Sequence, residues 1–203
     1  MVLDGRPTLQ TLAVLLAVAL IQSVVGLARG LEYALFVLDP TVTVRPWALV
    51  TSIYAHSGVA HLLANVVALA VLGPLVARRT TTLRYHAFFL TTGALAGLGE
   101  VYLGGLVGPA HAVWGASGGV LAFLGYLLAG NVVSTRALDR VDLSARAQLV
   151  LFGIVVAVVT LAASGPGAAV IGHATGLACG LVAGRARLLD VSSTPTPEPS
   201  YRL

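Results

Sequence analysis

Six apolar runs of about 20 residues divide the chain, and polar segments separate most of them. The runs cover residues 9–28, 59–77, 86–104, 113–130, 147–164 and 168–185. A helix that crosses a bilayer needs about 20 apolar residues, with a range of roughly 17 to 25. The pattern therefore predicts an all-α membrane domain over residues 1–185, built as a bundle of six membrane-spanning helices. Residues 186–203 are rich in Pro, Ser and Thr and predict a disordered tail.

The first run has the length of a signal peptide, but no clear small-residue cleavage site follows it. We interpret it as a membrane span that the protein retains. Residues 29–58, which join the first two runs, form a long connection for a helical bundle. They contain two amphipathic, aromatic segments, "GLEYALFVLDP" and "VRPWALVTSIYAH", whose composition suits the headgroup layer of a membrane.

Arginines mark alternate connections of the predicted bundle. They precede the first run and follow the second, fourth and sixth, as Arg6, Arg78, Arg79, Arg84, Arg136, Arg140, Arg146, Arg185, Arg187 and Arg202. The third-to-fourth and fifth-to-sixth connections contain no arginine, whereas the long first connection contains Arg29 and Arg45. Because cytoplasmic loops have the excess of positive charge, both termini and the tail are predicted to be cytoplasmic. The second, fourth and sixth helices then begin at the outer face.

Composition supports a multi-pass protein of the cell membrane. The chain is 57% hydrophobic and 10% charged, whereas about a quarter of the residues of a soluble domain are charged. The net charge of +4 comes from arginine alone, and its spread over separate loops argues against nucleic acid as a partner. Cys179 is the single cysteine, so the chain forms no internal disulfide. The Arg, Ala, Val and Gly bias is typical of a prokaryotic genome.

Polar residues gather at the starts of three predicted helices. His56 precedes the second helix, and His61 and Asn65 lie on one face of its first turns, four residues apart. Ser117 lies in the first turns of the fourth helix and His173 in those of the sixth. Ionisable groups inside membrane spans are rare and indicate function by default. These side chains are therefore predicted to share one depth, near the outer face.

Glycines indicate how the fourth and sixth helices meet. In the sixth helix they recur every four residues, and in the fourth they surround the serine: Gly172, Gly176, Gly180 and Gly184, then Gly115, Gly118, Gly119 and Gly125. Small residues at such spacing let membrane helices approach closely. We therefore expect this contact to bring Ser117 toward His173, with Gly115, Gly118, Gly176 and Gly180 supporting the site.

A serine next to a histidine is the nucleophile and general base of acyl transfer. The oxyanion that forms needs hydrogen-bond donors, and His61, Asn65 and the backbone N–H of Ser117 are the candidates. Neither Glu100 nor Asp39 has a spacing that completes a triad, so a dyad that needs no cofactor or metal is predicted.

Three segments, "HSGVAHLLANV", "GASG" and "HATGLACG", occur in this order on the second, fourth and sixth predicted helices. Together they resemble the motifs of the rhomboid family of intramembrane serine proteases, over roughly residues 35–185. The resemblance implies a six-helix core, a dyad of Ser117 and His173, an oxyanion site with His61 and Asn65, and a supporting role for His56. It also implies that the substrates are single-span, membrane-anchored proteins.

The chain departs from the family pattern at two places. Bacterial members often have Trp-Arg in the first loop, whereas here Ala48 follows Trp47 and Arg45 precedes it. Many members have a tyrosine four residues after the serine, packed against the histidine, and here that position is Leu121. Both differences predict altered anchoring of the loop or of the histidine.

Other functions fit parts of the pattern. His56, His61 and His173 could supply three imidazoles to a zinc ion, although that reading leaves "GASG" unexplained. A transporter could use the same groups as a proton relay, but they stop at one depth and no internal repeat is clear. A catalytically inactive relative that binds membrane helices would not need both Ser117 and His173.

Overall fold

A computed structural model describes the chain except for residues 1–4, 29, 108–111, 131–144, 164–168 and 192–203. Within the described residues the fold is helical, and the one departure is an isolated β-bridge between Leu38 and Val113. The prediction of an all-α protein is confirmed. The arginines Arg29, Arg136, Arg140 and Arg202 lie outside the described residues.

Each of the six predicted spans overlaps one long helix. These helices are α1 (Arg6–Val25), α4 (Val59–Ala77), α5 (Thr82–Leu98), α7 (Ser117–Ala129), α9 (Ala145–Ala163) and α10 (Val170–Arg185). Three helices of the described chain are long and apolar enough to cross a membrane: α1, α4 and the continuous segment Thr82–Gly104. A membrane protein is therefore supported, and the count of six spans stays a prediction.

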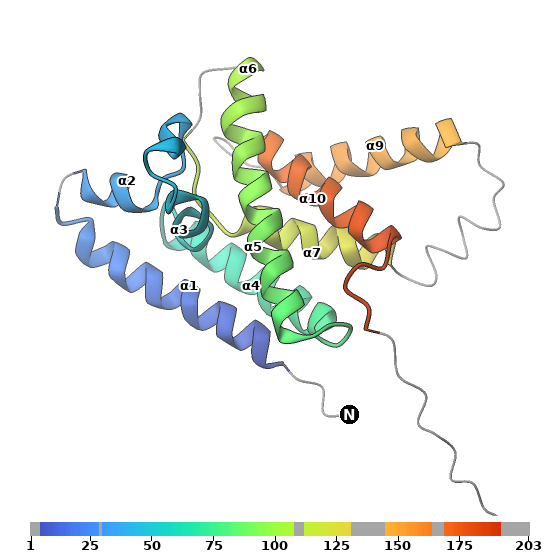
Figure 1. The fold of residues 1–203 in the computed structure, drawn as a ribbon, viewed down its shortest axis with the longest axis horizontal. Coiled ribbons are helices and arrows are strands. Elements are labelled where there is room, and N and C mark those ends of the chain that lie inside the picture. The colour runs from blue at the N-terminus through green and yellow to red at the C-terminus, as the bar shows by residue number, and fades with distance from the viewer. Residues whose placement is uncertain (1–4, 29, 108–111, 131–144, 164–168, 192–203) are drawn as a thin grey trace, which may run out of the picture.

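The helix α5 runs through the middle of the bundle (Figure 1). In that view α1 and α4 lie on one side of it, while α7, α9 and α10 lie on the other. Among the described helices the most extensive contact joins α7 to α10, and α5 packs against both of them. The two helices that begin with the predicted dyad region are thus the most tightly paired.

Aromatic side chains fill the core between α5 and α7. Tyr85, Phe89, Phe123 and Tyr126 are fully buried, and the rings of Tyr85 and Phe123 lie 4.7 Å apart. Tilted pairs of this kind add stability beyond the area that they bury. These rings form the aromatic part of a core to which α1 and α4 also contribute, with Leu15 and Leu69. The pairing of α5 with α7 holds the start of α7 in place.

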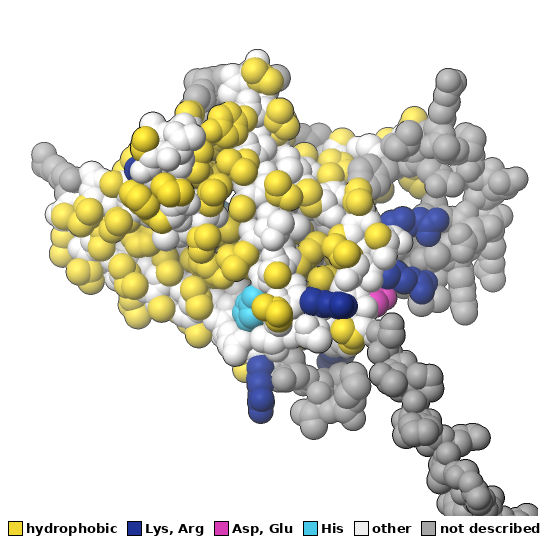
Figure 2. All heavy atoms as spheres, viewed as in Figure 1, with side chains coloured by type: hydrophobic (Ala, Val, Ile, Leu, Met, Phe, Trp, Pro, Cys, Tyr) yellow, Lys and Arg dark blue, Asp and Glu magenta, His cyan; other side chains and the backbone are white. Residues whose placement is uncertain are grey.

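The exterior of the bundle is strongly apolar. Leu16 and Leu20 on α1 and Val67 and Val71 on α4 are exposed, and Figure 2 shows apolar side chains over much of one face. Contiguous apolar surface of this extent is rare on soluble monomers and marks a membrane or interaction surface. This surface therefore suits contact with lipid rather than with water.

The close contact of α7 and α10 depends on glycine. A Cβ atom added at Gly176 would collide with the backbone of Gly118, and one added at Gly180 with the backbone of Ala122. Gly125 in turn leaves room for the backbone of Leu177. The two helices therefore touch backbone to backbone, as the glycine spacing predicts.

The ends of α4, α7 and α10 gather at one end of the bundle. The Arg79 guanidinium donates to the Gly130 carbonyl at the end of α7, at 3.1 Å. The N–H of Val191 donates to the Arg79 carbonyl, and Tyr126 donates to the Asp190 carboxylate. Residues 186–191, which the sequence analysis assigns to the tail, thus pack against the bundle, and residues 192–203 lie outside the described residues.

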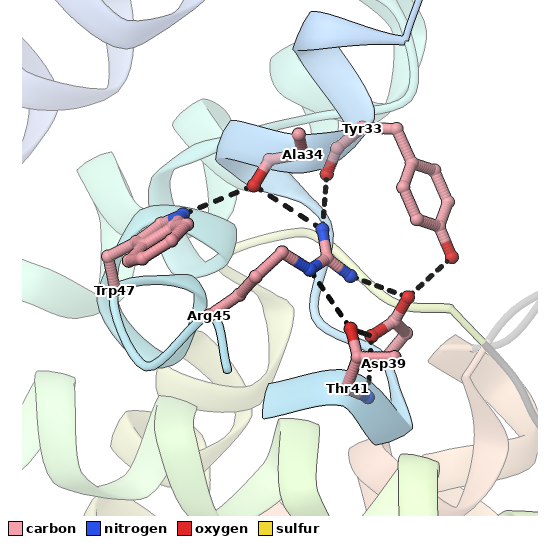
Figure 3. Close-up of polar contacts among 6 residues, drawn as sticks. All are labelled: Tyr33, Ala34, Asp39, Thr41, Arg45 and Trp47. Atoms are coloured by element: carbon pink, nitrogen blue, oxygen red, sulfur yellow. Dashed lines mark hydrogen bonds and ion pairs between the residues drawn. The ribbon is translucent and has the colours of Figure 1, made fainter. Parts of the chain in front are cut away.

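The long connection between α1 and α4 folds into three short helices, α2 (Leu31–Phe36), η1 (Pro40–Thr43) and α3 (Ala48–Tyr54). Arg45 links them (Figure 3). Its guanidinium donates to the carbonyls of Tyr33 and Ala34 and forms an ion pair with Asp39 at 2.6 Å. Arg45 therefore anchors the loop from a position two residues before Trp47.

Asp39 is the acidic partner in this network. Burial acts to raise the pKa of its carboxyl group, but hydrogen bonds from Thr41, Tyr33 and Arg45 outweigh it, so the pKa lies well below its usual value. The Trp47 indole donates to the Ala34 carbonyl at 3.1 Å beside the same group (Figure 3). The connection is thus a fixed part of the fold.

Candidate functional site

Ser117 is the first residue of α7, and an extended segment leads into it. Val113 exchanges two backbone hydrogen bonds with Leu38, and the Gly115 N–H donates to the Ser52 carbonyl at 2.8 Å. The φ angle of Gly115 is 133°, a conformation that favours glycine. The predicted span 113–130 is therefore a helix only from Ser117, because the segment before it is held by the α1–α4 connection.

Ser117 and His173 lie together. The His173 Nε2 and Ser117 Oγ atoms are 2.9 Å apart, within hydrogen-bond distance. His173 is in the first turn of α10 and is only 8% exposed. Gly118, which directly follows Ser117, has a close backbone contact with Gly176, three residues after His173, and this contact sets the approach. The arrangement has the geometry of a nucleophile and its general base.

A small cavity of about 30 Å³ lies at this pair. Its lining includes Ser52, Glu100, Gly115, Ser117 and His173. A space of this size can hold an ordered water molecule when polar groups surround it. The cavity therefore offers a place for water or for a reacting atom beside the serine.

The space left by the Gly115 side chain separates Ser117 from His61. A Cβ atom at Gly115 would lie 2.9 Å from His61 Nε2 and 3.8 Å from Ser117 Oγ. Both side chains thus border the same space, and any larger residue would fill it. A hydrogen bond of 3.0 Å joins Ser57 Oγ to His61 Nδ1 and orients the ring. Ser57 is not among the predicted site residues, and its one signal in the sequence is its position four residues before His61.

Asn65 is buried in α4, with 5% of its surface exposed. Its amide donates to the His61 carbonyl at 3.0 Å. It therefore lies one turn behind His61 as the spacing predicts, and its role at an oxyanion stays a prediction.

His56 is buried beside this group and connects α1 to the serine loop. Its ring is 5.0 Å from that of His61, edge to face, and its Nε2 accepts a long hydrogen bond of 3.5 Å from the Ala116 N–H. The Gln22 side chain pairs with the backbone of His56, accepting from its N–H and donating to its carbonyl. Gln22 was missed by sequence reasoning, although it is a buried amide in an apolar span.

Glu100 corrects the expectation that no carboxylate lies near the dyad. It is 3% exposed, lines the same cavity as Ser117 and His173, and accepts the Gly172 N–H at 2.7 Å. Gly172 directly precedes the histidine. Spacing along the chain could not show this, because the packing of α5 and residues 99–104 against α10 brings Glu100 to Gly172.

Leu121 packs in an apolar cluster with Leu177 and Leu181. The position where many relatives of the resembled family have a tyrosine therefore contributes to the contact of α7 with α10. Cys179 is a free thiol on α10.

The three-histidine zinc hypothesis gains no support from the geometry. In the described part of the chain, no group of three or more His, Cys, Asp or Glu side chains is arranged to hold a metal ion. His56 instead uses both ring nitrogens, one toward the Tyr54 carbonyl and the other toward Ala116.

Comparison with protein families gives one match. The model of the rhomboid domain matches residues 44–189, which is most of the chain and includes the serine, both histidines of α4 and α10, and Glu100. No curated protein matches the chain significantly.

Proposed function

The chain belongs to the rhomboid family, and on that premise we propose that it is an intramembrane serine endopeptidase. Its substrates are single-span membrane proteins, which it cleaves within the transmembrane segment near the outer membrane face. The protein acts within the lipid bilayer and requires no cofactor.

The proposal rests mainly on the 2.9 Å contact between His173 Nε2 and Ser117 Oγ. A serine in a membrane helix more often bonds to its own backbone, as Ser23 does with the Leu20 carbonyl. Ser117 instead faces an imidazole on another helix, and glycines on α7 and α10 allow that approach. Simple packing would not need a histidine there.

Ser117 Oγ attacks the substrate carbonyl carbon while His173 Nε2 accepts the hydroxyl proton. His173 then protonates the leaving amine, and the peptide C–N bond breaks. A water molecule, deprotonated by the same imidazole, next hydrolyses the acyl-enzyme. The cavity of about 30 Å³ beside the pair is large enough for this water.

The oxyanion forms in the space that Gly115 leaves open. Ser57 Oγ lies 3.0 Å from His61 Nδ1. In the proposed mechanism Ser57 donates this hydrogen bond, so the ring proton is on His61 Nε2, which borders that space. Ser117 is the first residue of α7, so its N–H has no acceptor within the helix and is a second donor. The Asn65 amide, one turn along α4, is the third candidate.

Orientation follows from the arginines. We assign both termini to the cytoplasm, so the starts of α4, α7 and α10 lie near the outer face. The hydrogen bond between Ser117 and His173 supports a common depth for the starts of α7 and α10. A substrate helix must unwind there, because the peptide bonds of a helix are shielded from attack.

The test is cleavage of a single-span reporter by the purified protein in liposomes. Ser117→Ala and His173→Ala should each abolish cleavage, and the double variant should be little worse than either, because the two residues act as a unit. A fluorophosphonate should label the wild type and lose that label in both variants. Ser23→Ala is the matched control and should keep full activity.

Three results would contradict the proposal. Cleavage by the Ser117→Ala variant would show that Ser117 is not the nucleophile. Inhibition by a chelator with rescue by zinc would favour the metal hypothesis. A folded wild type that neither cleaves a reporter nor reacts with the probe would favour a helix-binding or transport function.

A further inference from the structure

We propose that Glu100 is a positioning residue that holds His173 toward Ser117 and, as a carboxylate, stabilises the imidazolium that forms during the reaction. The inference rests on the proposed function and adds a third group to its dyad.

Two observations place Glu100 beside the base. Its Oε2 accepts the Gly172 N–H at 2.7 Å, on the residue next to His173. Its side chain lines the cavity that Ser117 and His173 also line. Burying a carboxylate inside a membrane protein costs free energy, and such groups usually have a function. Glu100 lies beside the candidate site.

The local backbone is built to admit this side chain. Residues Gly99–Gly104 form a π-helix, a feature that is rare and frequent at functional sites. A Cβ atom at Gly104 would lie 3.0 Å from Glu100 Oε1, and one at Gly172 would lie 3.3 Å from Glu100 Cβ. A larger residue at Gly104 would therefore press on the carboxylate, whereas one at Gly172 would first meet the Ala96 carbonyl at 3.0 Å.

A purely structural explanation is that Glu100 caps the start of α10. Negative charge is favourable at a helix N-terminus, and a cap alone needs only an acceptor oxygen. The electrostatic role needs the charge as well. When Ser117 transfers its proton to His173 Nε2, a nearby carboxylate stabilises the imidazolium that forms.

The exchange Glu100→Gln separates these two roles. The amide oxygen can still accept the Gly172 N–H, while the negative charge is lost. Thermal stability should then stay close to wild type, and kcat should fall about tenfold with little change in KM, which is the effect of losing roughly one pKa unit of interaction. Glu100→Ala, which also loses the acceptor, should lower both stability and kcat.

The pH–rate profile supplies the readout that a cap would not change. The titratable groups around His173 include Glu100, which lines the same cavity, and His61 on α4, which borders the space beside Ser117. A carboxylate favours the protonated imidazole, and the base must be neutral to act. Without the carboxylate, the acid limb should lie about one pH unit lower.

Asp190→Asn is the matched control. It exchanges a carboxylate for an amide at the other end of α7, where Asp190 accepts from Tyr126, and it should leave the profile unchanged. In parallel, the His173 resonance is titrated by NMR in wild type and Glu100→Gln, and is assigned from its loss in His173→Ala. This readout does not depend on turnover.

If the wild type is active and Glu100→Gln has the same kcat and the same acid limb, the role of Glu100 is refuted and the proposed protease function stands. A variant of lower stability whose acid limb and NMR titration match the wild type would also refute that role, because Glu100 would then be structural. An inactive wild type would refute the proposed function, and the NMR comparison would still decide whether Glu100 acts on His173.

Discussion

A methyl group at Gly180 should force α7 and α10 apart. The added Cβ would lie 2.7 Å from both the Cα and the carbonyl carbon of Ala122, and closer still to the carbonyl oxygen. Carbon atoms pack at roughly 3.5–4.0 Å, so the helices must separate by close to one ångström. No flexible side chain is available to move instead.

The energy of this change can be worked from the contact. Overpacking a close interface costs about 1–3 kcal/mol, and replacing glycine by alanine within a helix returns about 1 kcal/mol. Because the clash is with backbone, the upper part of the range applies, and Gly180→Ala should destabilise the protein by about 1–2 kcal/mol. The His173–Ser117 distance depends on the same interface, so probe labelling of the serine should slow as well.

The matched control is Gly153→Ala on α9. A Cβ atom there meets nothing within 4 Å, so this variant should be as stable as wild type or more stable, by up to about 1 kcal/mol. Thermal unfolding in one detergent and the rate of fluorophosphonate labelling are measured for both variants. If Gly180→Ala behaves like Gly153→Ala in both assays, the helices do not meet through this glycine and the reasoning is refuted.

Four further predictions concern the site, the loop and the topology. Gly115→Ala should cut cleavage by at least about 10²-fold, because its methyl fills the oxyanion space, and wild-type turnover would contradict that geometry. Asn65→Ala should lower kcat by up to about 10²–10³-fold with a smaller change in substrate affinity. An unchanged rate in liposomes would show that Asn65 is not an oxyanion donor. The carboxylate of Asp39 has a lower pKa in the folded than in the unfolded protein, so it stabilises the fold fully above its unfolded pKa of about 4 and less as the pH falls below that value. The free energy of unfolding, measured from pH 6 to pH 3, should therefore decrease. In Asp39→Asn this decrease should be smaller. A cysteine introduced by Thr82→Cys, with Cys179 replaced, should resist a membrane-impermeant reagent in intact cells, and labelling from outside would reverse the topology.

The sequence alone determined the helical class, the family and the choice of Ser117 and His173. Apolar runs of this length predict helices because a helix pairs its own backbone polar groups within one segment, as a bilayer requires. The glycine repeat predicts a close helix contact because the sequence itself shows which face of the helix has no side chains. The family prediction is confirmed by the match over residues 44–189, while the catalytic roles stay predictions until activity is measured.

Only the tertiary structure revealed the groups around the pair. Glu100 reaches Gly172, which is 72 residues away, because α5 and residues 99–104 pack against α10. Gln22 is 34 residues from the His56 backbone that it holds, and Arg45 anchors its loop from an unexpected position. Such partners depend on how helices rotate and pack against one another. The pattern along the chain fixes the apolar face of a helix, but the polar group that meets a given side chain is decided by contacts between distant segments.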